Sequence, residues 1–369
     1  MQMGEKSGAV RRLGALVGTA SLVLGMMTAG LSAAATSASA AGSSFKACVV
    51  TDTGGINDKS FNESAYNGLL DAARLNPNIV PSYLSSTSST DYAPNIQSFV
   101  SQGCGIIVTV GFLMQQDTQT AATANPNQLF AIVDSNVTGS NVLSLNYMTN
   151  QGAFLGGYLA AATSKHGVVA TYGGLNITPV TIYMNGFVAG VRYFNMVNHK
   201  HVKVLGWVPA AGTCTLAKCN GKGTFVNSFT DATAGKTLTA TDFAAKADVV
   251  FPVAGGVGVG SIAAAKQAGK GHSVLWVDSN GCVTDKPDCG WLIGTVAKGV
   301  EPSVRDAVLA AASGKFKGGT YLGTLKNQGT ALEYGGIKVP GSLKAKIAKI
   351  SAGIQSGKIS VNPNHYPKK

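Results

Sequence analysis

The sequence has few charged residues and lacks the motifs of common hydrolases. Charged residues make up 12% of its 369 positions, too few for a solvated disordered chain or for the outer faces of a coiled coil. The 47 glycines follow no Gly-X-Y period, which excludes a collagen-like fibre. There is no G-x-S-x-G or H-E-x-x-H motif, and no S-x-x-K with its partner motifs. We therefore expect a globular protein and identify no catalytic residue in it.

Long apolar runs are absent too, except near the start of the chain. Lys6, Arg11 and Arg12 precede the apolar stretch 13–29, and an Ala- and Ser-rich stretch with Ala-x-Ala-type sites follows up to Ala41. This order is typical of a secretory signal peptide, so we predict one over residues 1–41 and an exported mature protein. An N-terminal membrane anchor is the alternative, because the stretch is near the lower length limit for spanning. No Cys follows it closely enough to serve as a lipoprotein acceptor.

Acidic residues are scarce relative to basic ones. The formal net charge is +12, and removal of residues 1–41, with three basic residues and one acidic residue, leaves about +10. The lysines are dispersed, and their densest group fits the exposed face of a C-terminal helix: Lys338, Lys344, Lys346, Lys349 and Lys358. We expect no nucleic-acid partner, and attraction to an anionic cell surface is the alternative interpretation of the charge.

Cysteine spacings typical of metal sites are also missing. No Cys-x-x-Cys pair occurs, and no His lies near a cysteine pair. The six cysteines are an even number in a chain predicted to be exported, so we expect disulfides. Cys214 with Cys219 and Cys282 with Cys289 can close small loops, and Cys48 and Cys104 can face each other across neighbouring strands. The pairing itself stays open.

Strand-like and helical patterns alternate along the chain. We predict strands at 46–52, 82–86, 105–111, 129–134, 141–147, 167–174, 201–208, 247–254, 273–278 and 291–297, and helices at 60–75, 92–101, 115–123, 152–165, 184–197, 231–246, 261–269 and 303–314. Such alternation of near-unbroken apolar strands with helices predicts an α/β protein with doubly wound parallel sheets. About ten strands favour two sheets, with the break near 146–152.

Polar and small residues follow several of the predicted strands. In doubly wound sheets ligands bind beyond the carboxyl ends of the strands, where this chain has Asp52, Gly111, Asp134, Gly174, Ala254 and Asp278. After the first strand, Asp58 or Ser60 can cap the next helix, and Phe61 is either a stacking platform in the crevice or a core residue. Asp, Asn, Gly, Phe and Lys at strand ends suit the reversible capture of a polar ring compound.

A glycine-rich turn at 255–260 invites comparison with a dinucleotide-binding motif. The fit is poor, because Ser261 stands where the third glycine of G-x-G-x-x-G would be. We instead expect Gly255 and Gly256 to open a helix whose backbone N–H groups meet polar ligand atoms. No cofactor is expected.

The segment 52–68, DTGGINDKSFNESAYNG, closely resembles the opening motif of the basic membrane protein family. The resemblance continues in order through 110–112, 124–134, 151–161, 185–191, 247–260, 275–280 and 295–308. It implies an extracytoplasmic substrate-binding protein of an ABC importer with the type I periplasmic-binding-protein fold. Such a protein binds a purine nucleoside between two closing lobes joined by three crossovers. The implied lobes are 45–148 plus 295–317, and 149–294 plus 318–369.

The resemblance also implies roles for individual residues. Asp52 and Asp58 match the motif acids, the first of which contacts the base; Phe61 matches the stacking ring, and Asn62 belongs to the same motif. Asp134 matches the strand-end acid of the first lobe, and Asp278 and Lys298 match the pair that holds the ribose hydroxyls. Phe229 is the best match for the second ring, with Phe225 or Trp207 as alternatives. Gly255 and Gly256 are expected to offer backbone contacts.

The implied function leaves several alternatives. We expect a monomer that binds a small molecule and an ABC permease and has no enzymatic activity. A binding protein of the same fold for a sugar or a signalling ligand, a ligand-sensing subunit of a membrane receptor and an exported nucleoside hydrolase are the alternatives. A hydrolase would need a metal-binding carboxylate cluster or an activated water, for which 52–58 is the one candidate stretch.

Overall fold

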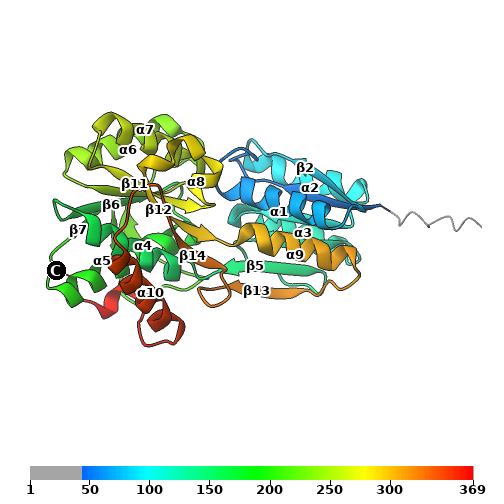
Figure 1. Ribbon diagram of the computed structural model, residues 1–369. Coiled ribbons are helices and arrows are strands. Elements are labelled where there is room, and N and C mark those ends of the chain that lie inside the picture. Colours follow the sequence, from blue (N-terminus) through cyan, green and yellow to red (C-terminus); the bar gives the residue numbers. More distant parts are fainter. Residues whose placement is uncertain (1–43, 369) are drawn as a thin grey trace, which may run out of the picture. The chain divides into compact units, whose positions relative to one another are not determined.

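The first of two large sheets consists entirely of parallel strands. The computed structural model describes residues 44–368, so the predicted signal peptide lies outside the described residues. The strand order is β13-β5-β4-β3-β1-β2. The strands are β1 (Phe45–Val50), β2 (Ile79–Leu84), β3 (Ile106–Val110), β4 (Leu129–Val133), β5 (Val142–Tyr147) and β13 (Gly319–Gly323). Helices α1 (Phe61–Leu75), α2 (Tyr92–Ser101), α3 (Gln115–Ala124) and α9 (Val300–Ala312) cover it, and we call the whole the first lobe (Figure 1).

The second sheet has the order β14-β12-β11-β10-β6-β7, and β14 pairs antiparallel with β12. Its strands are β6 (Val168–Gly173), β7 (Lys203–Leu205), β10 (Val249–Val253), β11 (Ser273–Asp278), β12 (Leu292–Lys298) and β14 (Thr330–Tyr334). With helices α4 (Thr149–Thr163), α5 (Thr178–Asn198), α6 (Ala232–Ala244), α7 (Gly258–Ala268) and α10 (Gly341–Gln355) it forms the second lobe. Both sheets are doubly wound, as the alternating pattern predicted.

Complete burial explains why the central strands are apolar along their whole length. Every residue of β3, β10 and β11 is buried, because helices cover both faces of each sheet. Helices α4 and α5 pack so closely that a Cβ atom at Gly157 would lie 2.1 Å from the Phe187 carbonyl oxygen. Among residues 44–368, no helix combines the length and apolar character needed to cross a bilayer.

The chain passes between the lobes three times, as predicted, but two of the exchange points differ from the prediction. It crosses after β5, after β12 and between β13 and β14. The boundary predicted at 295 is wrong, because β12 pairs with β11 as far as Ala297 and so belongs wholly to the second sheet. The boundary predicted at 318 is wrong as well, because β13 adds to β5 at the edge of the first sheet. The second and third crossovers between the lobes therefore fall near residues 299 and 324.

Two other regions depart from the predicted elements. The strand predicted at 201–208 is broken at Gly206, which has a left-handed φ of +82°. After this turn β8 (Trp207–Pro209) leaves the sheet and pairs with β9 (Gly221–Gly223) as a separate ribbon. The C-terminal region, for which we predicted no strand, supplies β13 and β14. The expected lysine-rich helix is present as α10, with Lys344, Lys346 and Lys349 exposed.

Three disulfides join the six cysteines in the pairs considered from the sequence. Cys48 in β1 pairs with Cys104 just before β3, and both are buried. Cys214–Cys219 closes the loop between β8 and β9. Cys282–Cys289 closes a segment made of the short helices α8 (Gly281–Thr284) and η4 (Lys286–Trp291). The first of these bridges lies in the core of a lobe, whereas the other two close short loops.

Loss of the core disulfide should destabilise the protein more than loss of a short-loop disulfide. Cys48 and Cys104 are 56 positions apart, so their bridge restricts the unfolded chain strongly, by about 4 kcal/mol in the chain-entropy treatment. Cys214 and Cys219 are 5 positions apart, for which the same treatment yields about 2 kcal/mol. Urea unfolding of the double Cys→Ala variants of each pair tests this. An equal loss in both variants would contradict it.

Candidate functional site

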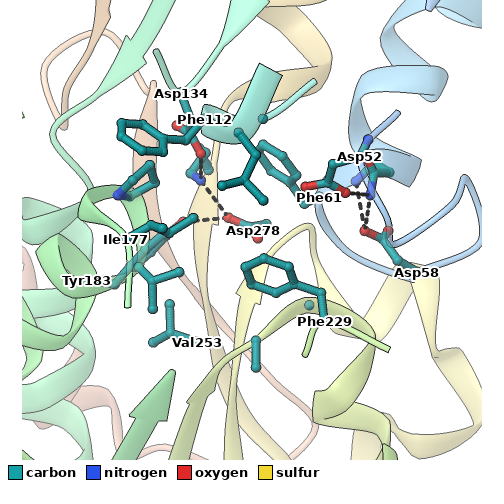
Figure 2. A pocket seen from close by; sticks show the side chains of 18 residues that line it. Asp52, Asp58, Phe61, Phe112, Asp134, Ile177, Tyr183, Phe229, Val253 and Asp278 are labelled. Atoms are coloured by element: carbon teal, nitrogen blue, oxygen red, sulfur yellow. Dashed lines mark hydrogen bonds and ion pairs between the residues drawn. The ribbon is translucent and has the colours of Figure 1, made fainter. Parts of the chain in front are cut away.

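A pocket lies where the carboxyl ends of strands from both lobes meet (Figure 2). Its empty space, counted together with the part that is open to solvent, is about 550 Å³. The lining residues are Asp52, Asp58, Phe61, Asn62, Gly111, Phe112, Leu113, Asp134, Ile177, Pro179, Val180, Tyr183, Phe229, Val253, Ala254, Gly255, Asp278 and Lys298.

All residues predicted to bind a ligand line this pocket, except Gly256. Gly256 lies just behind it, where an added Cβ atom would be 3.3 Å from the Phe229 carbonyl oxygen. The strand-end residues Gly111 and Ala254 are also at the pocket, but Gly174 is not among its lining residues and packs under Phe229. The structure therefore brings together residues spread from 52 to 298, while their contacts with a ligand remain predictions.

Asp58 holds the loop between β1 and α1 in shape. Its Oδ1 accepts hydrogen bonds from the backbone N–H groups of Ser60 (2.9 Å) and Glu63 (3.1 Å). Its Oδ2 accepts from the backbone N–H of Asn62 (2.8 Å) and from that residue's side-chain Nδ2 (3.2 Å). A carboxylate has about four acceptor positions, and these four bonds occupy them. Of the two capping candidates, Asp58 thus stabilises the start of α1, and it has little capacity left for a ligand.

Asp52 differs from Asp58 because one of its oxygens is free. Oδ1 accepts from the backbone N–H of Gly54 (3.1 Å) and from Nδ2 of Asn62 (2.7 Å). Within residues 44–368 no donor contacts Oδ2. Burial raises the pKa of Asp52 to about 6, with smaller contributions in the same direction from the charges of Asp58 and Asp134. Asp52 therefore offers one unoccupied acceptor oxygen, Oδ2, at the wall of the pocket, and its carboxyl group is ionised at neutral pH.

A buried lysine joins one aspartate from each lobe. Nζ of Lys298, at the end of β12, lies 2.6 Å from Oδ2 of Asp134 and 3.2 Å from Oδ1 of Asp278. Burial alone would lower the pKa of Lys298, but the two carboxylates outweigh it and raise that pKa above its usual value. The lysine is therefore charged, and the ion pairs connect the lobes at the base of the pocket.

The two aspartates occupy equivalent positions in their lobes. Asp134 directly follows β4 and Asp278 ends β11, and both have a left-handed backbone with φ of +63°. This conformation is uncommon for residues other than glycine and is found preferentially at functional sites. The turn directs each side chain beyond the end of its strand toward Lys298.

Tyr183 is a site residue that the sequence did not reveal. Its hydroxyl donates to Oδ1 of Asp278 (2.8 Å), and Ser60 Oγ donates to Oδ2 of the same residue (3.2 Å). Tyr183 lies in α5, which begins at Thr178 although we predicted its start at 184. Pro179 at the first turn was the available signal for the earlier start, since proline is favoured there.

Aromatic rings from both lobes border the pocket. Phe61, at the start of α1, is half-buried, and Lys298 Nζ lies 4.7 Å from the centre of its ring. Phe112 belongs to the first lobe and Phe229 to the second, and Figure 2 shows both with Phe61 around the acidic residues. The alternatives Phe225 and Trp207 pack against each other, with ring centres 6.0 Å apart, and do not line the pocket. Of the three candidates for the second ring, Phe229 is therefore the one that lines the pocket.

The pocket combines negative charge with apolar walls. Its lining includes four carboxylates and one ammonium, so an uncharged ligand with N–H or O–H donors suits it better than an anion. The Asn62 side chain donates to both Asp52 and Asp58, so a donor already occupies the space between these carboxylates where a metal ion would bind. No cluster of three or more His, Cys, Asp or Glu suited to a metal ion occurs in the described part of the chain.

Comparison with known proteins agrees with this architecture. The family model of the ABC transporter substrate-binding protein PnrA-like family matches residues 45–209 and 223–327. The ABC transporter nucleoside-binding protein BmpA of Lactococcus lactis subsp. cremoris is 31% identical over 333 residues, 86% of this chain and 88% of that protein. A CD4+ T-cell-stimulating antigen of Listeria monocytogenes is 30% identical over 294 residues, 75% of this chain and 76% of that protein. The family model does not match residues 210–222, which contain the loop closed by Cys214–Cys219.

Solved structures show the same fold at lower sequence identity. An ABC transporter solute-binding protein from Aeropyrum pernix is 24% identical, with a TM-score of 0.69 over 87% of this chain and 83% of that one. One from Conexibacter woesei is 18% identical, with a TM-score of 0.63 over 88% of this chain and all of that one. The two doubly wound sheets and three crossovers thus form the predicted type I periplasmic-binding-protein fold. The chain belongs to the PnrA-like family of ABC transporter substrate-binding proteins, the family that the segment 52–68 resembled.

Proposed function

We propose that this protein is the extracytoplasmic substrate-binding protein of an ABC importer and that it captures a purine nucleoside between its two lobes. The observation that supports this most directly is the combination of free acceptor oxygens with aromatic rings in one pocket. Asp52 Oδ2 and Asp134 Oδ1 make no hydrogen bond within residues 44–368. Phe61 and Phe229 border the same space from different lobes.

Different residues of the pocket suit the two parts of a nucleoside. Phe61 and Phe229 offer faces for a planar base, and base stacking contributes about 1–3 kcal/mol per base. Asp52 can accept an N–H of that base. Asp134, Asp278 and Lys298 form a group that binds neighbouring hydroxyls, because carboxylates accept from hydroxyls and the ammonium donates to them. The family resemblance implied this role for Asp278 and Lys298, and we add Asp134 because it contacts Lys298.

The relatives and the disulfides support the rest of the proposal. The Lactococcus relative is named as a nucleoside-binding protein of an ABC transporter. Three disulfides are typical of a protein that works in an oxidising, extracytoplasmic compartment. The partner is then an ABC permease, and one chain holds a complete pocket, as a monomeric binding protein requires.

Replacement of the proposed second stacking ring should weaken nucleoside binding. For Phe229→Ala we expect an affinity for adenosine or inosine about 5- to 150-fold lower, the range for loss of a stacked base. The matched control is Phe225→Leu, which changes a ring of the same lobe outside the pocket and should stay within about twofold. Isothermal titration calorimetry measures both. Equal affinities for Phe229→Ala and the unaltered protein would remove Phe229 from the site.

The negative pocket should prefer a nucleoside to its nucleotide. Adenosine is expected to bind more tightly than AMP, because one ammonium does not balance four carboxylates and a phosphate. Competition titrations test this, and tighter binding of AMP would refute the assignment.

The same protein incubated with inosine should release no free base. Release of hypoxanthine would identify the hydrolase alternative, and tight binding of a free sugar in place of any nucleoside would identify the sugar-binding one.

Nucleoside binding should weaken in acid. A ligand N–H needs the ionised form of Asp52, which is lost as the pH falls through its raised pKa of about 6. We expect inosine affinity to be about tenfold lower at pH 5 than at pH 7.5, since about a tenth of Asp52 is then ionised. Burial also raises the pKa values of Asp58 and Asp134, which acts in the same direction. Asp52→Asn should bind more weakly at pH 7.5 and show a flatter profile, and an unchanged profile in this variant would exclude Asp52 as the cause.

A further inference from the structure

Lys59 lies inside the binding motif but does not line the pocket. Its backbone carbonyl oxygen accepts three hydrogen bonds from the second lobe: from Trp276 Nε1 (3.3 Å), Ser279 Oγ (2.7 Å) and Thr284 Oγ1 (2.8 Å). Its backbone is left-handed, with φ of +56°, so the loop is turned sharply at this residue. One residue of the first lobe thus presents its carbonyl to three side chains of the other lobe.

The side chain of Lys59 makes a second contact with the second lobe, beside Thr284. Its Nζ lies 2.7 Å from Oδ1 of Asp285, whose side chain is 5% exposed, compared with 38% for Lys59. The other oxygen of Asp285 is buried and makes no hydrogen bond within residues 44–368. Without Lys59 the Asp285 carboxylate would remain buried and unpaired, which is costly.

Two of the four second-lobe partners of Lys59 belong to a segment that a disulfide closes. Thr284 and Asp285 lie between Cys282 and Cys289. Asn280 Oδ1 accepts from the N–H of Cys282 (2.9 Å) and caps the short helix α8. The segment 282–289 therefore has a fixed shape, and ordering it requires less conformational entropy when the lobes meet.

We propose that Lys59 is a positioning residue for ligand retention, which holds the β1–α1 loop against the disulfide-closed segment 282–289 and so slows ligand release. This inference rests on the proposed capture of a ligand between the lobes.

The location of Lys59 explains how it acts on the site without touching the ligand. Asp58 precedes it and Phe61 follows two positions later, so the contact fixes the loop that presents the stacking ring. The single O–H of Ser60 adds a hydrogen bond for which the Val277 carbonyl oxygen and Asp278 Oδ2 are both within reach. Opening of the lobes would break these contacts together. They therefore stabilise the closed form. Removing them should raise the dissociation rate of the ligand and leave its association rate unchanged.

The test compares two lysines that contact the same segment. Lys59→Met removes the ion pair of Lys59 with Asp285, which joins the lobes at this loop. The matched control is Lys266→Met, which removes the ion pair of Lys266 with Asp288, both within the second lobe. For Lys59→Met we expect dissociation of inosine about three- to tenfold faster, with an association rate within about twofold. Stopped-flow tryptophan fluorescence measures both rates. An unchanged dissociation rate, or an equal change in Lys266→Met, would overturn the proposal.

Two further variants separate the proposed role from a general loss of stability. Asp285→Asn should speed dissociation like Lys59→Met, and the double variant should be no faster than the faster single variant, because both remove one interaction. Cys282→Ser with Cys289→Ser should also speed dissociation, whereas Cys214→Ser with Cys219→Ser should not. Additive effects of Lys59→Met and Asp285→Asn would contradict a shared contact.

Small-angle X-ray scattering of the ligand-free protein distinguishes a failure of this inference from a failure of the proposed function. Lys59→Met should increase the radius of gyration relative to Lys266→Met, whichever ligand the protein binds. If no nucleoside binds but this shift occurs, the proposed ligand is wrong while the role of Lys59 in lobe closure stands. If nucleosides bind and neither scattering nor dissociation changes, the role of Lys59 is wrong.

Discussion

The bridge from Asp134 through Lys298 to Asp278 is the interaction on which the site depends. One acid comes from each lobe, and the lysine lies where β12 ends and the chain returns to the first lobe. Three like-charged carboxylates would otherwise repel one another here, so the lysine allows Asp52, Asp134 and Asp278 to share one small pocket. A ligand whose hydroxyls enter this group replaces hydrogen bonds between Lys298 and the two aspartates with hydrogen bonds from the same charged groups to the ligand. Such an exchange is compatible with both tight and reversible binding.

The loop between β1 and α1 combines three tasks within a few residues. Asp58 shapes it, Phe61 presents a ring to the pocket, and Lys59 contacts the other lobe. These functions do not compete, because the acid faces the loop interior, the ring faces the pocket and the lysine faces the segment 282–289. Asp58, Lys59 and Phe61 thus each have a different partner within a stretch of four residues.

Much of the site could be predicted because it follows the ends of parallel strands. Asp52, Asp134 and Asp278 all follow or end buried apolar strands, and within each sheet the topology brings such strand ends to one edge. Tyr183 could not be found in this way, since it lies within a helix whose apolar pattern looks like core. The commitment of Asp58 to backbone N–H groups depends on loop geometry that spacing does not reveal. The crossover near 324 was missed because a short strand, β13, returns to the first sheet after helix α9 of the same lobe. The crossover near 299 was missed because β12 remains in the second sheet to its end at Lys298.

The left-handed backbone at Asp134 and Asp278 has a consequence for sequence variation in this family. Asn and Asp tolerate this conformation, and Gly adopts it freely, whereas other side chains are strained there by about 1 kcal/mol or more. Substitution at these two positions is thus restricted by the backbone conformation as well as by the ion pairs with Lys298. Asparagine is the replacement that retains both shape and hydrogen-bonding size, so a homologue with Asn at one of them would retain the turn and lose only a charge. Such a protein would be a natural candidate for a pocket adapted to a more anionic guest.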